Sequence, residues 1–178
     1  MALVFQYGSN MSVARLNGED RLAGDARLIG VVRTEDSFDL MFTVWSKSNA
    51  CAAADLVPST TGRIIYGVLY EVPDFLLSRD TAKQRNRKSL DAIEGEGTNY
   101  VRVMINLTTK SGSTVSANTY LVKERRLDIK TSVAYVQHIL LGLKQHDIPE
   151  EYRQYVRSKI IENNKDIENE LLATTLNP

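Results

Sequence analysis

Apolar residues occur in short runs through the first two-thirds of the chain, separated by polar or glycine-containing segments. Short runs rich in β-branched and aromatic residues are typical of strands. Five runs predict strands over residues 3–7, 26–32, 38–43, 53–56 and 64–72. Two more, 101–106 and 114–122, flank the polar segment 110–113 and predict a hairpin.

The last third of the chain has a different period. Apolar residues recur at helical spacing, first at Val133, Val136, Leu140 and Leu143 and then at Tyr152, Val156 and Ile160. This spacing predicts two helices, because it places the apolar side chains on one helix face. The second helix is expected to begin near Pro149, a favourable first-turn residue. From Glu162 onward the chain is polar and is expected to form a frayed extension.

Strands therefore come first and helices last, which favours an α+β fold. We expect a closed or nearly closed, mainly antiparallel sheet, although periodicity alone does not distinguish a barrel from an open sheet. Neither a repeat nor a linker-like segment interrupts the sequence. The sequence therefore predicts a single domain over residues 1–178.

Composition is that of an ordinary globular protein, with 178 residues, 43% of them hydrophobic and 25% charged. The formal net charge is zero, so nothing global indicates a nucleic acid or a membrane surface as partner. No apolar run approaches the roughly 18 residues that a membrane span needs. The N-terminus lacks the basic segment of a signal peptide, and the single cysteine, Cys51, excludes an internal disulfide. We therefore expect a reducing, cytoplasmic location.

The segment Tyr7-Gly8-Ser9-Asn10 carries the first sign of chemistry. It joins the first predicted strand to a predicted helix over residues 11–16, with Asn10 as a plausible N-cap. A strand end, a glycine and a helix start together aim backbone N–H groups at one point, which suits an anion or a polarised carbonyl oxygen. Turn chemistry alone is the plainer interpretation of the same residues.

A second stretch, Leu90 to Gly95 followed by Tyr100, favours the functional interpretation of the turn over the structural one. Together with the first it resembles the γ-glutamylcyclotransferase-like family, which includes the AIG2-like proteins. Further matching segments are Tyr66-Gly67-Val68-Leu69-Tyr70, Asn118-Thr119-Tyr120-Leu121 and Ile148-Pro149-Glu150-Glu151-Tyr152. The motifs are weak singly and specific as an ordered set, and the resemblance covers a core of about residues 3–156.

The resemblance implies a small β-barrel flanked by helices, with the pocket at the mouth of the barrel. It implies an enzyme that releases 5-oxoproline and a free amine or amino acid from a γ-glutamyl compound, without metal or cofactor. The partner would be that small molecule, with no role for nucleic acid or membrane. A non-catalytic binding module of the same fold is the alternative. The leaving group and the oligomeric state stay open.

By the same resemblance, Glu94 is the catalytic acid and base. Locally, residues 89–94 predict a short helix with Gly95 just after it. A carboxylate at the negative end of a helix dipole is poorly placed for stability, and partial burial would raise its pKa toward the range useful for proton transfer. A solvated surface glutamate is the plainer interpretation, and Glu96 is the near competitor because the spacing to Tyr100 leaves the register open.

The remaining candidates line or border the same expected pocket. We expect substrate contacts from Tyr7, Gly8, Ser9, Asn10, Tyr100 and Tyr120. Ser9 is not expected to act as a nucleophile, because neither histidine, His138 nor His146, is placed to activate it. The basic stretch 79–88 could bind an acidic group, but a solvated face is the plainer interpretation.

Overall fold

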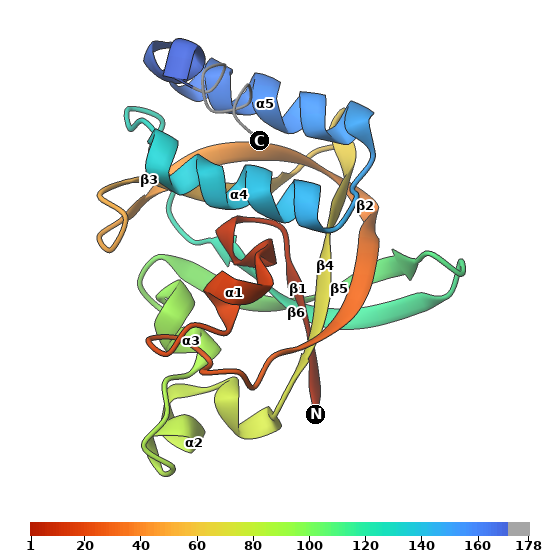
Figure 1. Ribbon diagram of the computed structural model, residues 1–178, viewed down its shortest axis with the longest axis vertical. Coiled ribbons are helices and arrows are strands. Elements are labelled where there is room, and N and C mark those ends of the chain that lie inside the picture. Colours follow the sequence, from red (N-terminus) through yellow and green to blue (C-terminus); the bar gives the residue numbers. More distant parts are fainter. Residues whose placement is uncertain (171–178) are drawn as a thin grey trace.

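The computed structural model describes residues 1–170, and Figure 1 shows a barrel of strands with helices packed above it and along one side. The strands are β1 (Ala2–Gln6), β2 (Arg27–Ser46), β3 (Cys51–Pro58), β4 (Arg63–Val72), β5 (Tyr100–Thr109) and β6 (Thr114–Val122). The hairpin predicted in the second half of the chain is formed by β5 and β6, which project to the right in Figure 1.

The sheet has the order β3-β2-β4-β1-β6-β5 and closes because β2 also pairs with β5. The closing contacts place Val32 opposite Thr109 and Thr34 opposite Leu107. The result is a five-strand barrel, β2-β4-β1-β6-β5, with β3 added on the outer side of β2. Only the pairing of β1 with β6 is parallel among these strands, so the expected mainly antiparallel barrel is confirmed.

Strand β2 corrects the prediction of two separate strands over 26–32 and 38–43. It runs without interruption for 20 residues, and its pairing with β4 shifts register between Arg33 and Ser37. The polar residues in that interval mark a bend rather than a loop. The first half of β2 closes the barrel against β5, whereas the second half pairs with β3.

The longer helices are α4 (Val133–Gln145) and α5 (Glu150–Asn163), which confirms the two helices predicted from spacing. The shorter ones are η1 (Ser9–Met11), α1 (Val13–Leu16), η2 (Asp74–Leu76), α2 (Arg79–Lys83), α3 (Leu90–Glu94) and η3 (Lys165–Ile167). Within residues 1–170 no helix is long and apolar enough to cross a membrane.

The frayed extension expected from Glu162 onward is wrong as far as residue 170. Helix α5 continues to Asn163, and both Asn164 and Ile167 beyond it are buried. The Asn164 side chain donates a hydrogen bond of 2.7 Å to the Thr131 carbonyl. These contacts fasten the end of the helical layer to the chain before α4, while residues 171–178 of the predicted extension lie outside the described residues.

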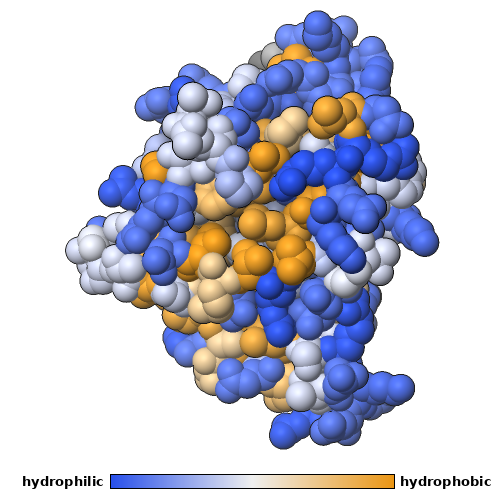
Figure 2. Space-filling view, turned by 180° about the vertical axis from the view of Figure 1, so that it is seen from behind, coloured by the Kyte–Doolittle hydropathy of each residue, from blue (hydrophilic) through white to orange (hydrophobic). Residues whose placement is uncertain are grey.

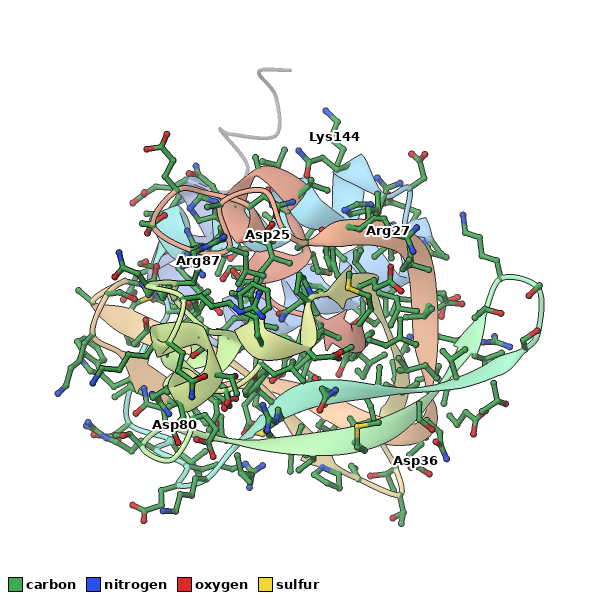
Figure 3. The ribbon with its side chains drawn as sticks, turned by 90° about the horizontal axis from the view of Figure 1, so that it is seen from below. Asp25, Arg27, Asp36, Asp80, Arg87 and Lys144 are labelled. Carbon is green, nitrogen blue, oxygen red and sulfur yellow. The ribbon has the colours of Figure 1, made fainter. Side chains whose placement is uncertain are left out.

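The basic stretch 79–88 mainly holds short elements together. Arg87 forms an ion pair with Asp25, and the two side chains point toward one another in Figure 3. Arg79 pairs with Glu96 at 3.2 Å and also donates to the Asp91 carbonyl at 2.7 Å. The stretch therefore ties α2 to the loop after α1 and to α3.

The face opposite to that of Figure 1 has apolar side chains at its centre, ringed by polar ones (Figure 2). Large apolar residues that stay exposed include Val101 and Met104 of β5 and Leu28 and Ile29 of β2. The candidate site residues gather between the end of β1 and the helices α3 and α4.

Candidate active site

The site begins where β1 ends. After Gln6 the chain leaves the sheet and turns, and the Met11 amide closes the turn on the Gly8 carbonyl at 3.1 Å. The predicted helix over residues 11–16 is only partly correct, because a 3₁₀ turn comes first and α1 follows it. The N-cap of α1 is Ser12, whose hydroxyl accepts a hydrogen bond from the Arg15 amide at 3.4 Å.

Asn10, expected to be the N-cap, has a different partner. Its side-chain amide donates a hydrogen bond of 2.8 Å to Oε1 of Glu94, 84 residues further along the chain. The guanidinium of Arg21 donates to Oδ1 of the same Asn10 at 2.9 Å. Because a guanidinium can only donate, it holds the Asn10 amide with its N–H groups toward the carboxylate. The N-terminal turn and the second motif therefore meet at Asn10 and Glu94.

Helix α3 places Glu94, and its ends follow ordinary capping rules. The Ser89 hydroxyl accepts from the Ala92 amide at 3.1 Å, and Gly95 ends the helix with a left-handed φ of 71°. One turn before Glu94, Asp91 accepts from Arg102 of β5 at 3.1 Å and from the Tyr120 hydroxyl of β6 at 2.9 Å. These bonds fasten the short helix to the barrel wall.

The Glu94 side chain keeps part of its surface open to a hollow, while its carboxyl group lies among buried side chains. Burial raises the pKa of Glu94 above its ordinary value, since it removes water from the charged form. The Asn10 hydrogen bond and the charge of Arg21 lower the pKa and offset part of this effect. A carboxylate with a raised pKa in an accessible hollow is suited to accept and return a proton.

The hollow itself is small, with a volume of about 30 Å³. Its walls are Phe5, Gln6, Tyr7, Gly8, Ser9, Asn10, Ala54, Glu94, Tyr100, Thr119, Tyr120 and Tyr135. All seven residues predicted as site residues are among them. The structure thus brings together the turn, the end of α3 and the two tyrosines of the hairpin, while their roles toward a substrate stay predictions.

A larger outer hollow of about 360 Å³ opens beside the inner one and shares Ser9, Glu94, Tyr100 and Tyr135 with it. It also includes Arg21 and several residues with hydroxyl or amide side chains, among them Ser46, Ser48, Asn49, Thr98 and Asn99. Glu96, the competing carboxylate, lines neither hollow and is paired with Arg79. The geometry therefore favours Glu94 in the choice between the two.

The hydroxyl groups of the three predicted tyrosines all donate hydrogen bonds to other groups of the protein. Tyr7 donates to the Tyr120 carbonyl at 2.7 Å, Tyr100 to the Ala54 carbonyl at 2.8 Å, and Tyr120 to Asp91. Burial raises the pKa of all three hydroxyls, so they stay protonated at neutral pH. Their rings shape the hollow, and their oxygens can accept but have no free hydrogen to donate.

Sequence reasoning missed Gln6, Arg21 and Tyr135. Tyr135 lies on α4, where its hydroxyl accepts from the Ala54 amide at 3.0 Å, and burial raises its pKa to about 12. Its apolar helix position gave no functional signal, and neither did Arg21, which lies in a polar loop. Gln6 could have been found, because it immediately precedes the turn and is a polar residue at the end of an otherwise apolar strand.

The histidines stand apart from Glu94. The His146 ring lies 2.9 Å from the Met11 carbonyl, and His138 is partly exposed on α4 with its pKa lowered by burial and by the charges of Arg15 and Arg21. Among residues 1–170, no group of three or more His, Cys, Asp or Glu side chains is arranged to hold a metal ion.

Comparison with known proteins agrees with the fold. Similar solved structures include a gamma-glutamyl cyclotransferase, with 22% identity, 88% of this chain and 86% of the other covered, and a TM-score of 0.71. A second is a human protein described as uncharacterized, with 23% identity and a TM-score of 0.71. The match covers 88% of this chain and 86% of the human one. A third is YkqA from Bacillus subtilis, with 20% identity and a TM-score of 0.69. The match covers 89% of this chain and 54% of YkqA. At these identities the likeness shows the fold alone.

No curated protein matches the sequence. A sequence model of the AIG2-like family, by contrast, matches residues 64–156, which is more than half of the chain and includes α3, Glu94 and both strands of the hairpin. This protein belongs to the AIG2-like family.

Proposed function

We propose that this protein is an enzyme of the γ-glutamylcyclotransferase type, which converts a γ-glutamyl compound into 5-oxoproline and a free amine or amino acid. One observation carries the proposal: Glu94, a carboxylate with a raised pKa, lines the same hollow as the turn Tyr7 to Asn10. The likeness in fold to a gamma-glutamyl cyclotransferase supports the assignment.

The reaction is intramolecular. The α-ammonium of the substrate gives a proton to the Glu94 carboxylate, and the resulting amine attacks the substrate's own γ-carbonyl carbon. The new C–N bond closes a five-membered ring and leaves a tetrahedral oxyanion. When this intermediate collapses, Glu94 returns its proton to the departing nitrogen as the C–N bond to the leaving group breaks. The ring nitrogen then gives its second proton to Glu94, which passes it to the released amine. Holding the substrate folded contributes by proximity.

The turn offers donors for the oxyanion. Strand β1 ends at Gln6, so the turn lies beyond the sheet ladder, and the Gly8 and Ser9 amides make no backbone hydrogen bond within residues 1–170. A Cβ at Gly8 would lie 3.5 Å from Ala54 Cβ and 3.7 Å from the Tyr135 hydroxyl, both on the wall of the inner hollow. A side chain at Gly8 would therefore fill space that the reacting group needs.

The two hollows suit a compound with a small reacting end and a larger remainder. The inner hollow, about 30 Å³, has room for little more than a carbonyl oxygen and its neighbours. The outer hollow, about 360 Å³, is lined by hydroxyl and amide side chains, by Arg21 and Lys47 and by a few apolar residues, and can take the rest of the molecule. Glu94 lines both hollows. Its carboxylate can therefore carry the proton from the attacking nitrogen to the leaving nitrogen.

The test is formation of 5-oxoproline from a panel of γ-glutamyl amino acids, glutathione and γ-glutamylamines. The substitution Glu94→Gln keeps the shape and the hydrogen bond from Asn10 but removes the base. We expect kcat to fall by at least about 100-fold, the usual cost of losing a general base. Glu96→Gln is the matched control and should change activity little, because Glu96 lines neither hollow.

Near-full activity of Glu94→Gln, or loss of activity in Glu96→Gln alone, would show that the assignment of the base is wrong. If the wild type forms no 5-oxoproline from any compound of the panel, the second candidate applies, a binding module without catalysis. Binding of γ-glutamyl compounds without turnover, measured by calorimetry, would support that candidate.

A further inference from the structure

Gln6 is the last residue of β1 and lies directly before the turn. Its side chain is only 6% exposed and forms part of the wall of the inner hollow together with Glu94. Its amide nitrogen, Nε2, is buried and has no hydrogen-bond partner within residues 1–170. Buried amide groups nearly always find partners, because an unpaired donor has lost its water without replacement.

Several of the neighbouring donors are already used. The hydroxyl hydrogens of Tyr7 and Tyr100 go to backbone carbonyls, and the Thr119 hydroxyl donates to the Phe5 carbonyl at 3.1 Å. The Asn10 amide donates to Glu94. The Gln6 amide differs from these groups, since its nitrogen lies near Glu94 but completes no hydrogen bond within residues 1–170.

We propose that the Gln6 side-chain amide donates a hydrogen bond to the oxygen of the substrate's γ-carbonyl and to the oxyanion that forms from it. This inference rests on the proposed function. It makes Gln6 a catalytic residue that acts beside Glu94 and supplements the backbone amides of the turn. A neutral donor suits this role, because it stabilises developing negative charge without neutralising the Glu94 carboxylate.

The position of Gln6 relative to Glu94 supports the assignment. In a cyclisation of this kind, the base and the oxyanion donors must surround the same carbonyl carbon. The Gln6 amide faces the Glu94 carboxylate closely enough to act as a weak donor to it and to lower its pKa, after the larger effects of Asn10 and Arg21. Because an amide nitrogen carries two hydrogens, one can face Glu94 while the other meets an oxygen in the hollow. Both side chains border the inner hollow, so an oxygen placed there would meet the unpaired nitrogen while the attacking amine faces Glu94.

The first test is Gln6→Met, which keeps the length of the side chain and removes its donors. On the best γ-glutamyl substrate we expect kcat to fall about 100-fold, as for loss of one oxyanion donor, with little change in KM. The melting temperature should stay the same or rise, because a buried unpaired amide is removed. Gln154→Met is the control, since Gln154 is exposed on α5 and should leave activity and stability unchanged.

A second measurement separates the carbonyl from the substrate's α-carboxylate as the partner of Gln6. The lactams 5-oxoproline and 2-pyrrolidinone share the ring carbonyl, but only the first carries a carboxylate. Their affinities are measured by NMR titration of wild type and Gln6→Met. Our proposal predicts that both lactams lose affinity by the same factor. A loss confined to 5-oxoproline would overturn it, because Gln6 would then bind the carboxylate.

The outcomes distinguish this inference from the proposed function. If the wild type is active and Gln6→Met keeps its kcat, the role of Gln6 is wrong and the proposed function stands. If the wild type has no activity on the panel, the proposed function fails, and unchanged lactam binding in the variant would overturn the Gln6 contact as well. Should Gln6→Met fail to fold, Gln6→Leu, which also lacks a donor and adds no charge beside Glu94, must show the same loss of kcat.

Discussion

At Glu94, burial makes the folded chain bind a proton more tightly than the unfolded chain does, because the pKa is raised above the ordinary 4.5. The contribution of this residue to stability is therefore most favourable at low pH. It is lost as the pH rises from the unfolded pKa to the raised folded pKa, and above that it stays constant. A charged, partly buried carboxylate thus reduces the stability of the fold at neutral pH.

The variant Glu94→Gln should consequently be more stable than the wild type at pH 7.5, and the difference should shrink toward zero as the pH is lowered past 4.5. Urea unfolding at several pH values measures this. In the control Glu96→Gln, which breaks a partly exposed ion pair, stability should change by about 1 kcal/mol or less. A Glu94→Gln variant less stable than wild type at pH 7.5 would contradict the assigned direction of the pKa shift.

Asn10 also affects the pKa of the Glu94 carboxylate, in the direction opposite to that of burial. Its hydrogen bond lowers the pKa of Glu94, so Asn10→Ala should raise that pKa and shift the acidic limb of the pH–rate profile to higher pH. Activity at pH 7 should fall, because a smaller fraction of Glu94 is then ionised and able to accept a proton. Arg21→Met should shift the limb in the same direction, because the Arg21 charge also lowers the pKa. An unshifted limb in both variants would refute this account.

Among the elements, α3 depends most on its surroundings. A helix of five residues is too short to be stable alone, so the position of Glu94 relies on what Asp91 contacts. Arg102 and the Tyr120 hydroxyl both bind Asp91, and the Arg79 guanidinium binds its carbonyl. The Tyr120 hydroxyl therefore positions the helix, although the sequence suggested a substrate contact for this residue.

Removing the Tyr120 hydroxyl distinguishes a role in positioning α3 from a contact with the substrate. Tyr120→Phe should lower the free energy of unfolding by about 1.5–3 kcal/mol, the usual worth of a hydrogen bond to a charged group. Activity should fall mainly through kcat, because Glu94 loses its fixed position. Tyr155→Phe, which removes a hydroxyl that accepts from the Leu40 amide away from the hollows, should lower stability without changing kcat. A rise in KM with unchanged stability would instead indicate a substrate contact by Tyr120.

Across the whole molecule, the helical layer supports the N-terminal turn. Helix α4 lies directly against η1, and Gly142 makes that approach possible. A Cβ at Gly142 would lie 2.7 Å from Met11 Cβ and 3.2 Å from the Ser12 amide nitrogen. Residues from the last third of the chain thus determine where the turn of the first ten residues can lie.

Helix propensity alone predicts that Gly142→Ala stabilises α4 by about 1 kcal/mol. The contact with Met11 should reverse this and lower the free energy of unfolding by about 1–3 kcal/mol, as in other overpacked cores. Activity should fall too, because the turn is displaced. Ala134→Gly, at an exposed position of α4, should lower stability by about 1 kcal/mol and leave kcat unchanged. A stabilised, fully active Gly142→Ala would refute the close packing.

The sequence by itself determined the local elements, because alternating and helical spacings record which faces are buried. It located β4, the hairpin β5–β6, α4, α5 and the short helix that ends at Gly95. The resemblance in its motifs indicated the barrel, Glu94 and the turn, and the structure brings these residues to one hollow.

Only the tertiary structure decided the contacts between distant segments. It showed that β2 is continuous and closes the barrel on β5, since a bend at polar residues looks like a loop in sequence. It gave Asn10 a partner 84 residues away rather than a cap, and it committed the tyrosine hydroxyls to carbonyls and to Asp91. Gln6 remained without a partner. Whether a polar group is paired depends on chain segments that no local pattern records.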